Sequence, residues 1–149
     1  MKTLLIVLGL SLTMCQAEAQ KVKSKDVPAE VKNTLQKSYA VTDADWDKED
    51  GSFEANFELK GNEMSVLIDT KGNILEVETE IAKNELPAAV LKSLESNYKD
   101  FKIEETARIE ANGVVTYEVE VEKGKQSFDL IFDLDGVLIE KLSKETNKD

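Results

Sequence analysis

The sequence predicts an α+β protein made of two tandem α-β-β-β-β repeats, with an antiparallel sheet that has helices on one face and an open polar face. Two observations lead to this prediction. The helix-like residues 27–39 recur at 86–98, and the strand and turn pattern of 53–72 recurs at 117–136. After each helix-like segment, apolar and polar residues alternate, as they do in half-buried antiparallel strands. A duplication of this kind usually builds one core from two supersecondary units.

The first 19 residues have the pattern of a secretory signal peptide. Lys2 precedes an apolar stretch at 4–12, and a small-residue cleavage motif ends at Ala19. The apolar stretch is too short to span a membrane, so we expect no membrane span. Lipidation at Cys15 is the alternative, but Met14 is larger than the residue that lipoprotein signals prefer at that place. We therefore predict cleavage after Ala19 and a periplasmic or secreted protein.

Both ends of the processed chain are polar. Residues 20–26 show no periodicity, which predicts a flexible leader, and the charged residues 143–149 predict a tail that frays. Between them we assign the first repeat to residues 27–81 and the second to residues 86–142.

Each repeat should begin with an amphipathic helix, because apolar residues recur every four positions. Pro28 and Pro87 suit the first helical turn, where a missing N–H costs nothing. The apolar stripes are Val27, Val31, Leu35 and Tyr39 in the first repeat, and Leu86, Val90, Leu94 and Tyr98 in the second.

Four strands should follow each helix, and their short connections require antiparallel pairing. Gly72 and Gly136 are the natural positive-φ positions of two equivalent turns. The expected strands are 44–48, 53–59, 64–68 and 74–81 in the first repeat, and 102–109, 114–122, 127–132 and 137–142 in the second.

Composition restricts the function. The formal net charge of −11 repels nucleic acid and anionic membrane surfaces, and favours basic partners or cations. The chain has no histidine, and its single cysteine falls in the signal peptide. The imidazole base, the thiol nucleophile and the usual zinc ligands are therefore missing. We predict no cofactor.

Residues 131–138 imitate the first motif of haloacid-dehalogenase phosphatases, with Asp133 as nucleophile and Asp135 as acid and base. The context does not fit, because that fold needs a long chain after the motif. The first repeat also carries Asp69 and Gly72 at the equivalent places. We therefore predict a turn here and no catalytic residues.

A second motif resembles a calcium loop. Asp43, Asp45, Asp47 and Glu54 occupy its first, third, fifth and twelfth positions, but Lys48 stands where an EF-hand needs glycine. We favour an acidic strand. A cation-binding envelope protein of the calcium type, which would use such carboxylate clusters, is the alternative function.

Glutamates recur on the predicted polar face and form its candidate partner-binding surface. Trp46 is either an exposed binding anchor or, as is more common for a lone tryptophan in a small domain, part of the core. The candidate residues are Glu54, Glu58, Glu76, Glu78, Glu118, Glu120 and Trp46, with Glu122 on the same face. The partner we expect is an envelope or secreted protein with a basic patch.

The repeat resembles the PepSY-like family of exported bacterial proteins, which is related in shape to the β-lactamase-inhibitor-protein fold. The residues that carry the resemblance are the helix opening Val27-Pro28-Ala29-x-Val31, the strand around Trp46, the strand at 53–59 and the turn Asp69-x-x-Gly72, with the second-repeat counterparts Leu86-Pro87-x-x-Val90, 117–121 and Asp133-x-x-Gly136. It implies an exported protein without enzymatic activity, whose sheet face and turns meet a partner. The second repeat has no counterpart of Trp46.

Overall fold

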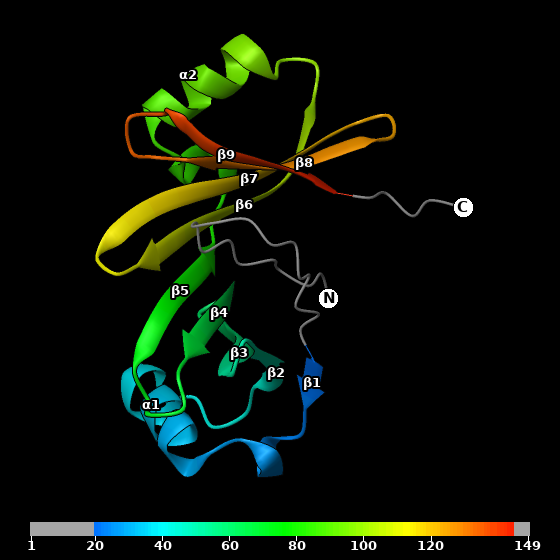
Figure 1. Cartoon of the computed structure of the whole chain (residues 1–149). Coiled ribbons are helices and arrows are strands. Elements are labelled where there is room, and N and C mark those ends of the chain that lie inside the picture. The colour runs from blue at the N-terminus through cyan, green and yellow to red at the C-terminus, as the bar shows by residue number, and fades with distance from the viewer. Residues whose placement is uncertain (1–19, 145–149) are drawn as a thin grey trace.

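Residues 20–144 are described by the computed structural model, and within them nine strands form one antiparallel sheet (Figure 1). The strands lie in the sheet in the same order as in the sequence. They are β1 (Gln20–Val22), β2 (Asp45–Glu49), β3 (Ser52–Leu59), β4 (Asn62–Ile68), β5 (Ile74–Glu80), β6 (Lys102–Ala111), β7 (Val114–Lys123), β8 (Gln126–Phe132) and β9 (Leu138–Lys144). The predicted α+β class with an antiparallel sheet is confirmed.

Two α-helices accompany these strands. α1 (Ala29–Tyr39) precedes β2, and α2 (Ala88–Asn97) precedes β6. Each begins directly after a proline, Pro28 or Pro87, whose fixed φ suits a helix start. Short 3-10 helices, Ser24–Asp26 and Lys83–Glu85, lie before the two prolines. Figure 1 shows α1 and α2 at opposite ends of the molecule, with the strands between them.

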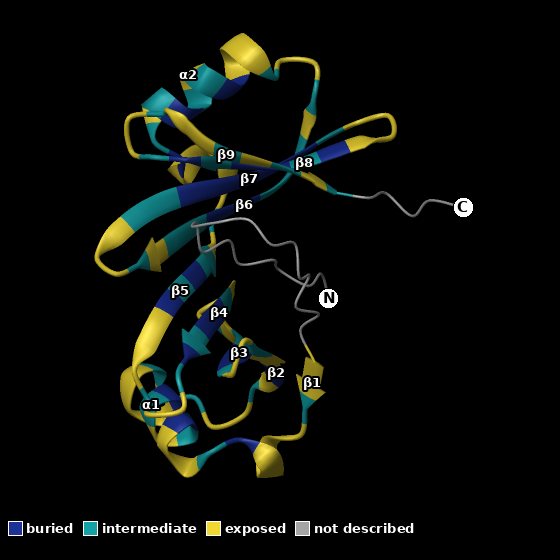
Figure 2. Ribbon diagram, viewed as in Figure 1, coloured by how far each residue is buried: buried dark blue, intermediate teal, exposed yellow. Residues whose placement is uncertain are grey.

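Two hydrophobic clusters hold the helices to the sheet (Figure 2). In both clusters, strand residues of one alternation pack against the apolar stripe of a helix, so these side chains all leave water on folding. The first contains Val27, Val31, Leu35, Trp46, Phe53, Ala55, Val66 and Ile68. The second contains Leu86, Val90, Leu94, Tyr117, Val119, Val121, Leu130 and Phe132.

The prediction of a flexible leader at residues 20–26 is wrong. Gln20–Val22 form β1, which pairs antiparallel with β2 and places Val22 opposite Trp46. Val22 packs against the first cluster. The reason is that β2 would otherwise be a bare sheet edge, and a short strand with one apolar residue covers it.

At the other end, β9 continues through Lys144 and so includes two residues that were assigned to the charged tail. The predictions for residues 1–19, including Cys15, and for residues 145–149 lie outside the described residues.

The phosphatase-like motif is a turn, as predicted. Asp133 Oδ1 accepts hydrogen bonds from the backbone N–H groups of Asp135 (3.0 Å) and Val137 (2.8 Å). Asp69 Oδ1 does the same for Lys71 (2.8 Å) and Asn73 (2.9 Å). In both turns a short aspartate side chain satisfies backbone donors, which is its usual role in a reversal.

Glycine is required in these turns for two reasons. Gly72 and Gly136 have φ values of 86° and 76°, which L side chains rarely adopt. A Cβ on Gly136 would also lie 2.4 Å from the carbonyl oxygen of Ala89, in the first turn of α2. Each turn therefore rests on the start of its own helix, and Thr34 of α1 donates a hydrogen bond to the Gly72 carbonyl (2.8 Å).

In the described part of the chain, neither helix has the length and apolar character needed to cross a membrane.

Candidate acidic binding face

Acidic side chains gather on the sheet face opposite the two helices. Strand alternation produces this arrangement: Trp46, Ala55 and Val66 face the first cluster, so their neighbours Asp47, Glu54 and Ser65 face the other way. We call this side the acidic face. Its acidic residues are Asp45, Asp47, Glu49, Glu54, Glu58, Glu63, Glu76, Glu78, Glu80, Glu105, Glu118, Glu120, Glu122, Asp129 and Glu140.

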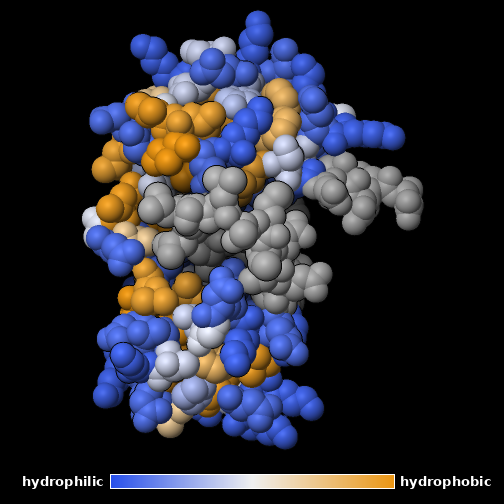
Figure 3. All heavy atoms as spheres, viewed as in Figure 1, coloured by the Kyte–Doolittle hydropathy of each residue, from blue (hydrophilic) through white to orange (hydrophobic). Residues whose placement is uncertain are grey.

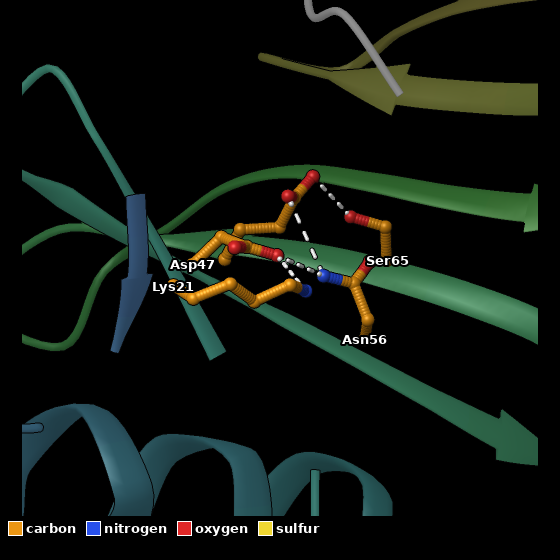
Figure 4. A network of polar contacts seen from close by, with 5 residues as sticks. Lys21, Asp47, Asn56 and Ser65 are labelled. Atoms are coloured by element: carbon orange, nitrogen blue, oxygen red, sulfur yellow. Dashed lines mark hydrogen bonds and ion pairs between the residues drawn. The ribbon is translucent and has the colours of Figure 1, made fainter. Parts of the chain in front are cut away.

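One end of the acidic face is neutralised by a lysine from β1. Lys21 Nζ lies 2.9 Å from Asp47 Oδ2, and this carboxylate is 4 % exposed (Figure 4). Asn56 Nδ2 donates to the same oxygen at 3.2 Å. Ser65 Oγ donates to Glu54 Oε1 at 2.6 Å. The donors to these two buried carboxylates offset the cost of removing them from water.

The other end has the same device. Lys144 of β9 lies 3.0 Å from Glu120 Oε2 and 2.9 Å from Asp129 Oδ1. The two outermost strands of the sheet, β1 and β9, thus each supply one ammonium group to the acidic face. Lysines on edge strands also discourage pairing with another chain.

The centre of the face differs. We call the junction of β5 and β6 the seam. Burial raises the pKa of Glu78 on β5 to about 9, and repulsion from Glu118 and Glu76 adds to it. Burial, with repulsion from Asp129, raises the pKa of Glu118 to about 8. Burial likewise raises the pKa of Glu76 to about 7. At neutral pH Glu78 and Glu118 therefore hold protons and Glu76 is about half protonated, because ionising these groups close together in a buried place is unfavourable.

Glu78 is the least satisfied of these groups. Its residue is 6 % exposed, and its Oε2 atom has no hydrogen-bond partner among the described residues. Its side chain lines a hollow in the acidic face of about 280 Å³. The walls of this hollow come from β1 to β6 and comprise Lys21, Asp45, Asp47, Glu54, Asn56, Phe57, Glu58, Glu63, Met64, Ser65, Glu78, Glu80 and Glu105.

Most of the predicted binding glutamates are not on a wet surface. Glu58 is exposed, as expected, but five others are buried, with less than a tenth of each residue accessible. The prediction of an open face is therefore wrong for them, because the neighbouring side chains are crowded enough to exclude water. The buried residues are Glu54, Glu76, Glu78, Glu118 and Glu120.

Trp46 is not a surface anchor. It is 4 % exposed and belongs to the first hydrophobic cluster, on the helix side of the sheet. The core interpretation of this residue is confirmed, and it cannot contact a partner bound to the acidic face.

The calcium-loop hypothesis fails. Asp45 and Asp47 lie on the strand β2, whose extended backbone cannot wrap their carboxylates around one ion, and Asp43 lies before it. Asp47 is occupied by Lys21. Within residues 20–144 no group of three or more acidic side chains is arranged to hold a metal ion.

Sequence reasoning missed the lysines and the small polar residues of the site. Lys21 was assigned to a leader and Lys144 to a tail, while Asn56 and Ser65 were unremarkable members of strands. The available signal for a strand was Val22, an apolar residue next to Lys21 in an otherwise polar segment. That signal is short and weak.

Apolar side chains are exposed at three turns on one side of the sheet. They are Ile74 and Leu75 near the β4–β5 turn, Val114 at the β6–β7 turn, and Leu134, Val137, Leu138 and Ile139 around the β8–β9 turn. Figure 3 shows hydrophobic surface along the side of the molecule where these turns lie.

The fold and this face define the class: an α+β protein in which two helices pack on one side of an antiparallel sheet and carboxylates line the other. A family model of PepSY-like proteins, described as candidate β-lactamase-inhibitor-like proteins, matches residues 13–76 and 52–140. The chain belongs to this PepSY-like family.

Solved structures share the fold. A DUF2874 family protein from Bacteroides uniformis is 20 % identical with a TM-score of 0.74, covering 81 % of this chain and 92 % of its own. A BLIP-like protein from Bacteroides fragilis is 27 % identical with a TM-score of 0.68, over 82 % and 90 % of the two chains. A candidate periplasmic protein from Bacteroides eggerthii is 17 % identical with a TM-score of 0.76, over 81 % and 93 %. A search of curated proteins found no match.

Proposed function

We propose that this chain is an exported, non-catalytic binding module of two PepSY-like repeats, which captures a protein partner on its acidic face in the periplasm or outside the cell. The inhibitor-like description of the family and the BLIP-like neighbour support a protein-binding role. One observation carries the proposal: many carboxylates share one face of a continuous sheet, and the lysines Lys21 and Lys144 pair with them at its two ends.

The partner should carry a basic patch. Clustered charges of one sign attract an oppositely charged surface over several ångströms and speed its approach, and this attraction weakens in salt. The exposed rim of the hollow, Asp45, Glu58, Glu63 and Glu80, is the part that a large partner reaches first. Glu58 and Glu63 lie directly opposite each other on β3 and β4, where like charges repel. A basic partner would relieve that repulsion.

The test is capture of partners from a cell-envelope extract by the immobilised protein, at low and at high salt, with identification by mass spectrometry. The variant Glu58→Lys/Glu63→Lys reverses charge on the rim of the acidic face. The matched control Asp26→Lys/Glu95→Lys makes the same net change at exposed positions away from the rim. We expect a salt-sensitive partner that the control retains and the rim variant loses. Equal capture by both variants, or no salt-sensitive partner, would contradict the proposal.

A further inference from the structure

We propose that the hollow beside the seam is a pocket for a single basic side chain, an arginine or lysine, of the protein partner, and that Glu78 is its central carboxylate. This inference rests on the proposed function and deepens it. The exposed rim attracts the partner, and the buried pocket recognises one of its side chains.

The protein itself shows how the acidic face accepts an ammonium group. At one end Lys21 reaches Asp47 at 2.9 Å, and at the other Lys144 reaches Glu120 and Asp129 at 3.0 and 2.9 Å. Both lysines come from the outermost strands. The seam is too far from either edge to be paired in this way, since three strands lie between β5 and β1, and three between β5 and β9.

Glu78 is the observation that points to an external cation. It is a carboxylate more than nine-tenths buried, and one of its oxygens has no donor among the described residues. A buried polar atom without a partner is costly and uncommon in native proteins. Glu54 accepts a hydrogen bond from Ser65, whereas Glu78 lines the hollow and its Oε2 atom has no donor among the described residues. An arriving N–H donor would satisfy it.

The shape and chemistry of the hollow suit a long basic side chain rather than a bare metal ion. At about 280 Å³ it has room for several water molecules or for one side chain. Glu54, Glu78 and Glu105 line it. The charged end of a basic side chain pairs with carboxylates of this kind.

Proton release should accompany binding. The charged groups facing Glu78 are Glu118, Glu76, Glu105 and Glu54, and all of them favour its protonated form. A basic side chain favours the ionised form instead, so binding must displace the proton. The affinity for a basic probe should therefore rise between pH 6 and pH 9.

The experiment uses two synthetic peptides, acetyl-Gly-Arg-Gly-amide and the same peptide with uncharged citrulline in place of arginine. Each is titrated into the purified protein, and side-chain carboxyl resonances are followed by NMR at pH 6, 7.5 and 9. We expect the arginine peptide to shift the Glu78 signal, and to bind more tightly as pH rises. The citrulline peptide should leave the signal unchanged.

The variant Glu78→Gln keeps the size of the side chain and removes its charge. It should weaken arginine-peptide binding by about tenfold or more, the value of one charge-assisted hydrogen bond, and flatten the pH dependence. Glu95→Gln, an exposed position on α2, is the matched control and should bind as the parent does. Because glutamine is close in shape to the protonated Glu78 side chain that it replaces, we expect Glu78→Gln to fold, and its amide spectrum verifies this.

Three results would overturn the pocket: equal binding of both peptides, unchanged binding by Glu78→Gln, or Ca²⁺ shifting the Glu78 signal at concentrations where the arginine peptide does not. These failures are distinct from failure of the proposed function. If the envelope extract yields a salt-sensitive partner that Glu78→Gln captures as well as the parent, the module binds proteins but not through this pocket.

Discussion

β1 and β5 occupy equivalent places in the two halves of the molecule. Each covers the first strand after a helix: β1 pairs with β2, and β5 pairs with β6. β1 brings Lys21 to the acidic face, whereas β5 brings Glu76, Glu78 and Glu80. The same topological position therefore neutralises charge in one half and concentrates it in the other. This difference shows why carboxylates concentrate at the seam: the strand that joins the two halves, β5, carries glutamates where β1 carries a lysine.

Substitutions in the two hydrophobic clusters should give the largest change in unfolding free energy between the two halves. Trp46→Ala should cost about 3–5 kcal/mol of unfolding free energy, because the indole is buried in the first cluster. Phe101→Ala, at the edge of the second cluster, should cost clearly less because Phe101 is only partly buried. Urea unfolding followed by circular dichroism measures both. Equal losses would mean that the halves do not differ in how they use an aromatic residue.

The equivalent turns offer the next test. Gly136→Ala should cost about 2–4 kcal/mol, since strained backbone and a clash with fixed backbone atoms add together. Gly72→Ala should cost less, because its Cβ would meet the Thr34 hydroxyl at 2.8 Å and its nearest backbone atom, the Glu30 oxygen, only at 3.3 Å. Gly113→Ala, with a positive φ of 76° but open space, is the control for strain alone. Unfolding midpoints in urea rank the three variants, and a Gly113→Ala loss as large as that of Gly136→Ala would refute the clash.

The seam should make stability depend on pH. Glu78 has a pKa of about 9 when folded and an ordinary one of 4.5 when unfolded, so the folded state binds the extra proton between these values. The stabilisation is complete below pH 4.5 and is lost as pH rises through 9. Glu78→Gln should therefore raise the unfolding free energy at pH 8 by about 1–3 kcal/mol and reduce its decline from pH 5 to 9. Thermal unfolding across this range measures the slope. A parallel, unshifted curve would show that Glu78 ionises normally.

The two lysines give the smallest effect. Lys144→Met should cost about 1–2 kcal/mol, because it leaves two nearly buried carboxylates without their ammonium group. Lys21→Met should cost less, since Lys21 is 65 % exposed and Asn56 still donates to Asp47. Urea midpoints at low and high salt compare them. A larger loss of stability for Lys21→Met than for Lys144→Met would contradict this ranking.

The helices, the turns and the alternation of strands were predictable, because each depends on local patterns. The proline before each helix and the four-residue apolar spacing lie within a dozen residues, and the Asp–Gly turns occur twice in the sequence. β1 was not predictable from its own residues. Its stability comes from β2 and from Val22 against Trp46, which are contacts made across 24 residues of chain.

The sequence predicted the sheet face on which the candidate glutamates lie, but not their burial. Alternation placed Glu54, Glu76, Glu78, Glu118 and Glu120 on the correct face. It could not reveal that these residues are buried, because burial depends on how the sheet curves and on neighbours from other strands. The cross-strand lysines were missed for the same reason, since Lys144 reaches Asp129 and Glu120 from a segment that looked like a tail.

The sequential strand order has a consequence for how the chain folds. β2 to β5 and β6 to β9 are two meanders closed by short turns, so their pairing needs only local loop closure, which is fast. β5 meets β6 only after α2 has been placed, because that helix lies in the connection between them. We therefore expect the two meanders to form early and their joint to close late. In the folded protein the same joint should open at lower free energy than either meander, and its amide protons should exchange with solvent sooner than those within β3 and β7.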